Sequence, residues 1–236
     1  LVTGRAMAIP DLAEKADTIL LTWMLGVEAG NAVADVVYGK KAPAGRLPVD
    51  FPRTTGQVPI VYSETPSGRP ADPDLSKDSN RYMDLPITPQ FAFGHGLTYT
   101  DFDYGVPRIG SDVADPGDHF SISVDVTNTG PRTGEEVVQL YMRDPVSASA
   151  RPKRELRGFK RVSIPAGETA TVTFTLSPLQ AATYAGNGAW HVEAGMLDFM
   201  VGPSSDETAG TVSIRVEGSA DTETPAAAIE TGVAVK

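Results

Sequence analysis

The feature that most constrains the fold is a change of hydrophobic period near residue 118. Beyond this point apolar and polar residues alternate, as Phe120, Ile122 and Val124 do against their polar neighbours. A period of two places alternate side chains on opposite faces of a strand, so the pattern predicts half-buried β-strands. The segments that carry it are HFSISVDVTNTG, EEVVQLYMRDP, ELRGFKRVSIP, ETATVTFTLS, AWHVEAGMLDFMVG and GTVSIRVEG.

Turn-forming residues separate these segments, for example at Asn128–Gly130 and Pro165–Gly167. About seven short strands at this spacing are typical of a β-sandwich of the immunoglobulin or fibronectin type III kind. We therefore expect residues 105–218 to form an all-β fibronectin type III-like sandwich. Residues 219–236 have no such pattern and are expected to form a loosely attached tail.

The first forty residues have α/β character instead. The segment LVTG predicts a short strand, and Pro10 suits the first turn of a following helix. The continuous apolar run TILLTWML predicts a strand covered on both faces, and a second helix follows that ends near Gly39. Two strands cannot bury a parallel sheet, so residues 1–62 are expected to form the C-terminal part of an α/β-sandwich domain whose other strands lie upstream.

Residues 63–104 are expected to form a proline-rich ordered connection. Prolines between positions 43 and 89 exclude regular helix and central strand from this part of the chain. Aromatic residues are interspersed among them, which favours an ordered path across another surface over a flexible linker. The aromatic residues are Phe51, Tyr62, Tyr82, Phe91 and Phe93.

Composition excludes several classes of partner and site. The 236 residues carry a net charge of −10, so nucleic acid and anionic membrane surfaces are not expected as partners. The chain has no cysteine, which excludes disulfides and cysteine-based zinc sites. No apolar run approaches the roughly 20 residues of a membrane span. Because Leu1 lies within an apparent strand, the lack of a visible signal peptide carries little weight.

Several long stretches together resemble the C-terminal part of glycoside hydrolase family 3, the β-glucosidase and exo-glucanase family. The segments from Ile19 to Tyr62 and from Ser79 to Tyr104 resemble the end of its α/β-sandwich domain and the path leading out of it. Three further segments resemble its fibronectin-like domain: VTNTGPRTGEEVVQLYMRDP, RPKRELRGFKRVSIPAGETATVTFTL and AGMLDFMVGPSS. The chain departs from the family pattern at His95, where an aromatic residue is usual, and at Thr98, where serine is usual.

This resemblance implies the C-terminal part of a retaining β-glucosidase that hydrolyses terminal β-D-glucosyl residues. It also implies a periplasmic or extracellular location, no cofactor, and as partners the N-terminal remainder of the enzyme and a β-glucoside or oligosaccharide. The alternatives are the same part of a β-xylosidase, or a carbohydrate- or protein-binding β-sandwich module without catalysis. A free-standing module would not begin with half of a parallel sheet.

Retaining catalysis requires two carboxyl groups roughly 5–5.5 Å apart. In the family the nucleophile is an aspartate of an N-terminal barrel, and the acid/base is a glutamate earlier in the α/β-sandwich domain. Neither motif occurs here, so no catalytic residue is expected in this chain, which alone should be inactive. Five residues are candidates for positions near the substrate: Trp23, Glu28, Arg81, Tyr82 and Asp84.

Each candidate also has a structural interpretation. Trp23 could be a core residue, and Glu28 could be favoured by the helix dipole alone. Arg81, Tyr82 and Asp84 could line a sugar pocket by hydrogen bonding and stacking, or could lock their loop in place.

Other motifs point to structure. His95 lies between two glycines in FGHGLTYTDF, and we expect a tight turn between structural units in which Gly94 and Gly96 supply the backbone angles. DPDLSKDSN resembles the start of a calcium loop but has Lys77 in place of the glycine, so no metal site is expected. The basic run RPKRELRGFKR is expected to form an exposed edge strand and its loop.

Overall fold

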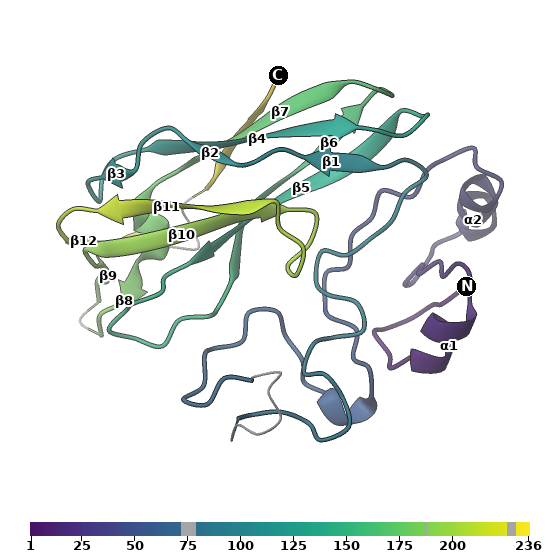
Figure 1. The fold of residues 1–236 in the computed structure, drawn as a ribbon, viewed down its shortest axis with the longest axis horizontal. Helices are drawn as coiled ribbons and strands as arrows, with labels where there is room; N and C mark the ends of the chain where they lie inside the picture. Colours follow the sequence, from purple (N-terminus) through teal and green to yellow (C-terminus); the bar gives the residue numbers. More distant parts are fainter. Residues whose placement is uncertain (72–78, 187, 226–229) are drawn as a thin grey trace. The chain divides into compact units, whose positions relative to one another are not determined.

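The computed structural model describes residues 1–71, 79–186, 188–225 and 230–236. The chain divides into two compact units. The N-terminal unit comprises residues 1–62 and 67–99, and the sandwich unit comprises residues 63–66 and 100–236. Figure 1 shows that the two α-helices lie in the first unit and the long strands in the second.

The sandwich unit consists of two five-stranded sheets and a small third sheet (Figure 1). In the first sheet the order is β1 (Phe102–Tyr104), β4 (Phe120–Asn128), β7 (Thr169–Leu176) and β13 (Gly232–Val235), with β2 (Arg108–Ile109) also paired to β4. In the second the order is β3 (Val113–Ala114), β11 (Gly210–Val216), β10 (Gly195–Gly202), β5 (Gly134–Arg143) and β6 (Glu155–Ile164). The third contains β12 (Ala220–Thr222), β9 (Trp190–Val192) and β8 (Thr183–Tyr184), and a short 3-10 helix, η2 (Pro178–Ala181), precedes β8.

The core of the sandwich lies where the alternation predicts it. Every second residue of β4, from Phe120 to Asn128, is buried, and β7 buries Val172, Phe174 and Leu176 in the same way. The prediction of an all-β fibronectin-like sandwich with half-buried strands is therefore confirmed. β5 differs because it is buried on both faces from Glu136 to Met142, a stretch that includes the buried polar residues Glu136 and Gln139.

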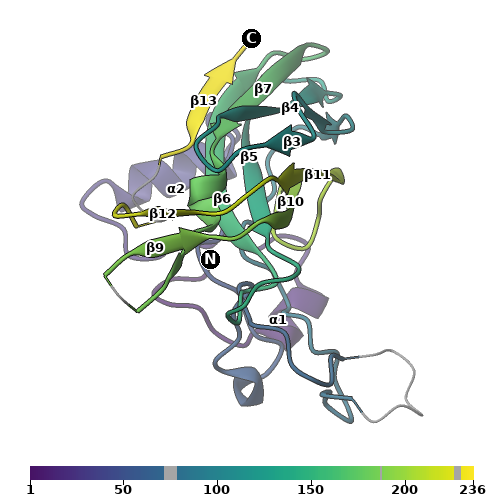
Figure 2. The same ribbon diagram turned by 90° about the vertical axis from the view of Figure 1, so that its left-hand side faces the viewer.

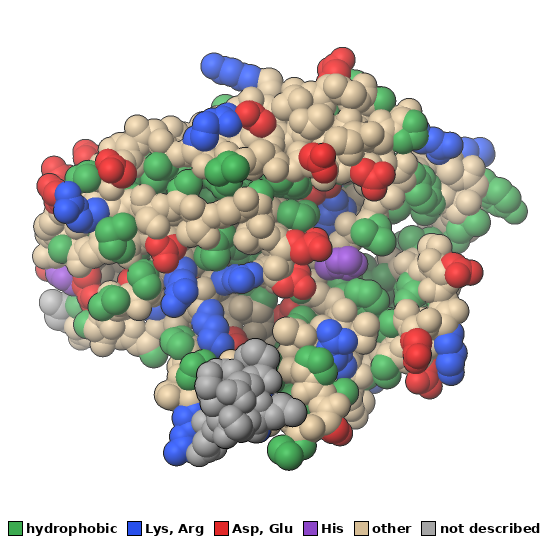
Figure 3. Space-filling model, viewed as in Figure 1, with side chains coloured by type: hydrophobic (Ala, Val, Ile, Leu, Met, Phe, Trp, Pro, Cys, Tyr) green, Lys and Arg blue, Asp and Glu red, His purple; other side chains and the backbone are tan. Residues whose placement is uncertain are grey.

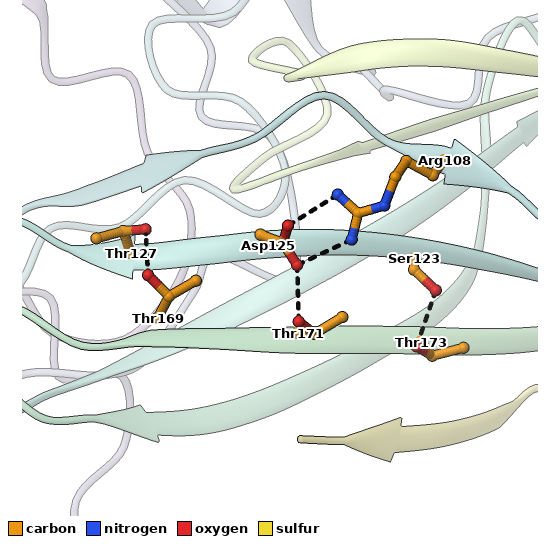
Figure 4. Close-up of polar contacts among 7 residues, drawn as sticks. All are labelled: Arg108, Ser123, Asp125, Thr127, Thr169, Thr171 and Thr173. Atoms are coloured by element: carbon orange, nitrogen blue, oxygen red, sulfur yellow. Dashed lines mark hydrogen bonds and ion pairs between the residues drawn. The ribbon is translucent and has the colours of Figure 1, made fainter.

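The outer face of the first sheet is lined by hydroxyl groups that pair across strands (Figure 4). Ser123 bonds to Thr173 at 2.9 Å, and Thr127 bonds to Thr169 at 2.8 Å. Between these pairs, Asp125 accepts two hydrogen bonds from the guanidinium of Arg108, at 2.8 and 3.0 Å, and one from Thr171 at 2.7 Å. These cross-strand pairs add to the backbone ladder that joins β4 to β7.

The expectation of a loosely attached tail is wrong for two segments. β12 pairs with β9, and β13 pairs antiparallel with β7. Figure 2 shows β13 lying beside β7 at the margin of its sheet. A strand of three or four residues has too few positions for a period of two to be recognised, which also explains why β1, β2, β3 and β8 had no clear sequence signal.

β6 forms the end strand of the second sheet, as the basic run predicts. Its first residues are less exposed than expected: the side chain of Arg157 is only 14% exposed and forms an ion pair with Glu155. Ahead of β6, Lys153 donates its backbone N–H to Glu64, at 2.9 Å, and its ammonium group forms an ion pair with the same residue. These contacts explain why residues 63–66 belong to the sandwich unit.

The N-terminal unit retains only part of the predicted parallel pairing. Val2 and Leu21 form one parallel bridge, supported by backbone hydrogen bonds from Val2 to Leu20 and from Thr22 to Val2. The two full strands predicted here are therefore wrong, although their parallel arrangement is confirmed. Both helices were predicted: α1 (Pro10–Lys15) has a proline in its first turn, and α2 (Ala29–Val37) is followed by Gly39 with φ 73°.

Candidate functional site

Trp23 lies immediately after the parallel bridge and has an unusual backbone. Its carbonyl accepts a hydrogen bond from Gly4 at 3.1 Å, and its φ is 49°, a conformation that is uncommon for a non-glycine residue. Its ring lies edge-on against Phe51 with centroids 6.2 Å apart. Such backbone strain clusters at functional sites, and the carboxyl ends of parallel strands are where ligands bind in open α/β sheets.

Glu28 is the residue before the first turn of α2. Its carbonyl accepts the helical hydrogen bond of Ala32, while its carboxylate accepts a 2.6 Å bond from Asn31. The side chain does not cap the backbone of the helix, and the residue is exposed. Trp23 and Glu28 therefore lie on one connection, between the parallel bridge and α2.

Arg81, Tyr82 and Asp84 lie on a separate loop. Arg81 donates to Ser79 at 3.1 Å, whereas Tyr82 and Asp84 are exposed. The end of this loop is anchored by Gln57, a buried residue whose amide donates to the Pro86 carbonyl at 3.0 Å. The structure thus places the five candidates on two segments. Glu28 bonds to Asn31, Arg81 bonds to Ser79, and Asp84 is exposed to solvent.

Two residues that the sequence did not single out hold the N-terminal unit together. The buried carboxylate of Asp50 accepts a 2.7 Å hydrogen bond from the backbone of Phe93. Gln57 accepts a 2.6 Å bond from the backbone of Arg53 while donating to Pro86. No pattern marks a single buried polar residue in a proline-rich segment, so only the structure identifies their positioning role.

His95 also helps to hold the N-terminal unit together. Its ring stacks on Phe91 with centroids 5.4 Å apart, and its carbonyl accepts a 2.9 Å hydrogen bond from Leu47. Gly94 has φ 84°, as the expected tight turn requires. Gly96 is needed for a different reason: a Cβ atom there would lie 2.5 Å from the Gly45 carbonyl oxygen.

The sandwich unit has a small polar depression that is open to solvent. Asp144, Thr183, His191 and Glu193 contribute to its lining, and none of the five candidate residues does. Burial raises the pKa of Asp144, against the opposing attraction of Arg151. His191 Nδ1 lies 2.6 Å from a carboxylate oxygen of Asp221 on the neighbouring strand.

The described residues contain no cluster of three or more His, Cys, Asp or Glu side chains arranged to hold a metal ion. The segment that resembles a calcium loop falls largely on residues 72–78, which lie outside the described residues. Within the described part of the chain, no helix has the length and apolar character of a membrane span. On the face shown in Figure 3, acidic and basic side chains are interspersed.

Comparison with known proteins gives the same division of the chain. Residues 1–99 match the family described as glycosyl hydrolase family 3 C-terminal domain, and residues 136–205 match the fibronectin type III-like domain. A periplasmic β-glucosidase of Salmonella typhimurium is 40% identical over 75% of this chain and 23% of its own length. A β-xylosidase of Formosa agariphila is 40% identical over 92% of this chain and 29% of its own length.

Solved structures agree with these relatives. A β-glucosidase from Listeria innocua, crystallised with isofagomine, superimposes with a TM-score of 0.85 at 32% identity and covers 92% of this chain and 30% of that protein. A β-glucosidase from Erythrobacter marinus gives a TM-score of 0.83 at 36% identity, over 92% of this chain and 27% of its own. The chain thus spans between 23% and 30% of the length of these relatives. It belongs to glycoside hydrolase family 3, of which it carries the C-terminal domain and the fibronectin type III-like domain.

Proposed function

We propose that this chain acts as the C-terminal part of a retaining β-glucosidase that removes terminal β-D-glucosyl residues. The observation that carries the proposal is the 40% identity to a periplasmic β-glucosidase along three quarters of the chain. The chain's role is architectural: its N-terminal unit completes the domain that bears the acid/base, and its sandwich unit braces that domain. The same relative supports a periplasmic or extracellular location.

The partner of the N-terminal unit is the remainder of the same enzyme. Its single parallel bridge gives only the start of a sheet, and none of the residues of α2 is buried. Large apolar side chains around this helix are exposed, which favours a surface that another part of a domain covers. These residues are Met24, Leu25, Val27, Val37 and Tyr38.

Within that complete enzyme, we place Trp23 and Glu28 nearest the substrate. Trp23 has a strained backbone at the carboxyl end of a parallel pairing, where open α/β sheets bind ligands. An indole ring there can stack on a sugar, and the exposed carboxylate of Glu28 can accept hydrogen bonds from hydroxyl groups. Arg81, Tyr82 and Asp84 are a second group that can contact the sugar from their loop.

The test compares the complete enzyme with this chain alone on 4-nitrophenyl β-D-glucoside and 4-nitrophenyl β-D-xyloside. We expect turnover by the complete enzyme, with the glucoside preferred, and none by the chain alone, because retaining hydrolysis needs two positioned carboxyl groups. The similarity to a β-xylosidase makes the xyloside the necessary second substrate. A preference for the xyloside would replace the proposed specificity, and turnover by the chain alone would overturn the architectural role.

The proposed substrate contacts are tested in the complete enzyme by Trp23→Phe and Glu28→Gln. A contact near the substrate should change KM or kcat while leaving the unfolding temperature within about 2 °C. Glu168→Gln, an exposed carboxylate of the sandwich unit, is the matched control for the second change. Kinetics identical to those of the parent enzyme in both variants would remove these residues from the proposed site.

A further inference from the structure

The C-terminal segment lies along the margin of the sandwich, where the end strands of both sheets meet. β13 pairs with β7 over Gly232–Val235, and the pairing continues through two reciprocal backbone hydrogen bonds between Thr171 and Lys236, at 2.8 and 3.0 Å. β13 also contacts β6, the end strand of the other sheet. The segment therefore lies against both β6 and β7, and we call the place that it occupies along these two strands the β6/β7 groove.

The side chain of Thr231 takes part in two consecutive hydrogen bonds. The amide of Gln180, which is only 1% exposed, donates to the hydroxyl of Thr231 at 2.9 Å. That hydroxyl in turn donates to the carbonyl of Arg157. Because a hydroxyl both accepts and donates here, serine or threonine fits this position and a purely apolar residue does not.

The backbone of β6 is shaped to admit Thr231. The register between β5 and β6 shifts at this point, passing from Gly158 to Leu156 and skipping Arg157, as in a β-bulge. A Cβ atom on Gly158 would lie 3.0 Å from the methyl group of Thr231 and 3.0 Å from the ring of Phe174. The glycine thus leaves the space that the threonine side chain occupies.

A second side chain enters the sandwich two residues later. Val233 packs against the hydrophobic core, while Gly232, Ala234 and Val235 are exposed. Residues two apart share one face of a strand, so Thr231 and Val233 both point into the groove. In contrast, Glu223, Thr224 and Pro225, which follow β12, are exposed.

We propose that the β6/β7 groove is a docking site for an extended peptide strand, specific for a hydroxyl residue followed two positions later by an apolar residue. In this protein the groove is filled by its own residues 230–236. Backbone pairing along β7 gives the affinity, and the hydrogen bond from Gln180 together with the apolar contacts of Val233 gives the selectivity, as in other modes of strand addition.

The first test uses the chain truncated after Thr222 and the synthetic peptide ETGVAVK, which corresponds to residues 230–236. Fluorescence anisotropy of the labelled peptide should show saturable one-to-one binding as protein is added to about 1 mM, the effective concentration typical of a short tether. The Thr231→Val peptide should bind about tenfold more weakly, since a buried amide loses its acceptor. Absence of binding to a truncated protein with native circular dichroism would overturn the proposal, as would equal binding of the two peptides.

A second test covers the case in which truncation prevents folding. In the full chain, Thr231→Val should release the C-terminal segment, so that amide hydrogen exchange at residues 172–175 and 233–236 accelerates about tenfold. Exchange in β10 and β11 should not change. Thr224→Val is the matched control, because this exposed threonine belongs to the same tail outside the groove. Equal exchange in the two variants would show that the hydroxyl of Thr231 does not contribute to binding in the groove.

Discussion

The hydroxyl of Thr100 donates a 2.6 Å hydrogen bond to Oδ1 of Asn128, a residue with no exposed surface. Asn128 uses the rest of its amide as well: its nitrogen donates to the carbonyls of Arg132 and Ile164, and Oδ1 also accepts from the backbone of Gly130. One side chain thus joins the entry of the sandwich unit to the ends of β4 and β6.

This network predicts a large effect of one substitution. Asn128→Ala should lower the free energy of unfolding of the sandwich unit by about 3 kcal/mol, because several buried polar groups lose their partner together. Thr127→Ala, one residue away, removes only the exposed bond to Thr169 and should cost less than about 1 kcal/mol. Urea denaturation of both variants measures the difference, and similar losses would show that the Asn128 network contributes little.

The turn around His95 should distinguish two reasons for a glycine. Gly94→Asn should destabilise much less than Gly94→Val, because asparagine tolerates the positive φ of this position. Gly96→Asn should gain no such relief, since any Cβ there meets the Gly45 carbonyl oxygen.

His95→Tyr should be milder than Gly94→Val, since a tyrosine ring can stack on Phe91 as the imidazole does. Thermal unfolding of the complete enzyme ranks the variants. Loss of turnover in His95→Tyr at unchanged stability would contradict the structural role of this residue.

Stability at acid pH should depend on Asp125. Hydrogen bonds from Arg108 and Thr171 lower the pKa of Asp125 from 3.8 to about 2, against a small opposing effect of burial (Figure 4). A carboxyl whose pKa is lower in the folded state stabilises that state above the unfolded pKa, and the contribution disappears as the pH falls from about 4 to 2.

Thr171→Val and Arg108→Met should therefore flatten the stability profile of the sandwich unit across this pH range. Thr173→Val is the control, because this hydroxyl bonds to Ser123 and leaves the partners of Asp125 in place. Urea midpoints measured at several pH values give the profiles. Since Asp125 is near the surface, the effect should also shrink in high salt. Identical profiles for the parent and the Arg108 variant would argue against the ion pair.

The boundaries of the fibronectin-like domain can be tested by truncation. We propose that residues 100–236 fold alone more stably than residues 105–218, although both contain all six long strands. The shorter piece lacks Thr100, β1, β12 and β13, and so loses the Asn128 contact and the pairing of β1 with β4, of β12 with β9 and of β13 with β7. Thermal unfolding followed by circular dichroism should give a higher midpoint for the longer piece. Equal midpoints would mean that these strands add nothing.

Sequence patterns predicted the long strands best where a strand buries one face and keeps its period, as β4 and β7 do. The signal failed for β1, β2, β3, β8, β12 and β13, which are too short to show a period. It failed differently at residues 1–25, where the apolar run predicts a full strand but only the Val2–Leu21 bridge forms within this chain. The hydrogen bonds that join Asp50 to Phe93 and Gln57 to Pro86 could not be predicted, because each pair lies more than 25 positions apart in the sequence.

β5 is buried on both faces and pairs with β6 on one side and β10 on the other. Water can reach its amide groups only when neighbouring strands separate. Its amides should therefore exchange with solvent only through global unfolding of the sandwich unit, whereas the short outer strands open in smaller fluctuations. The centre of the second sheet is then the last part of the molecule to lose its structure, and its exchange rate reports the total stability of the unit.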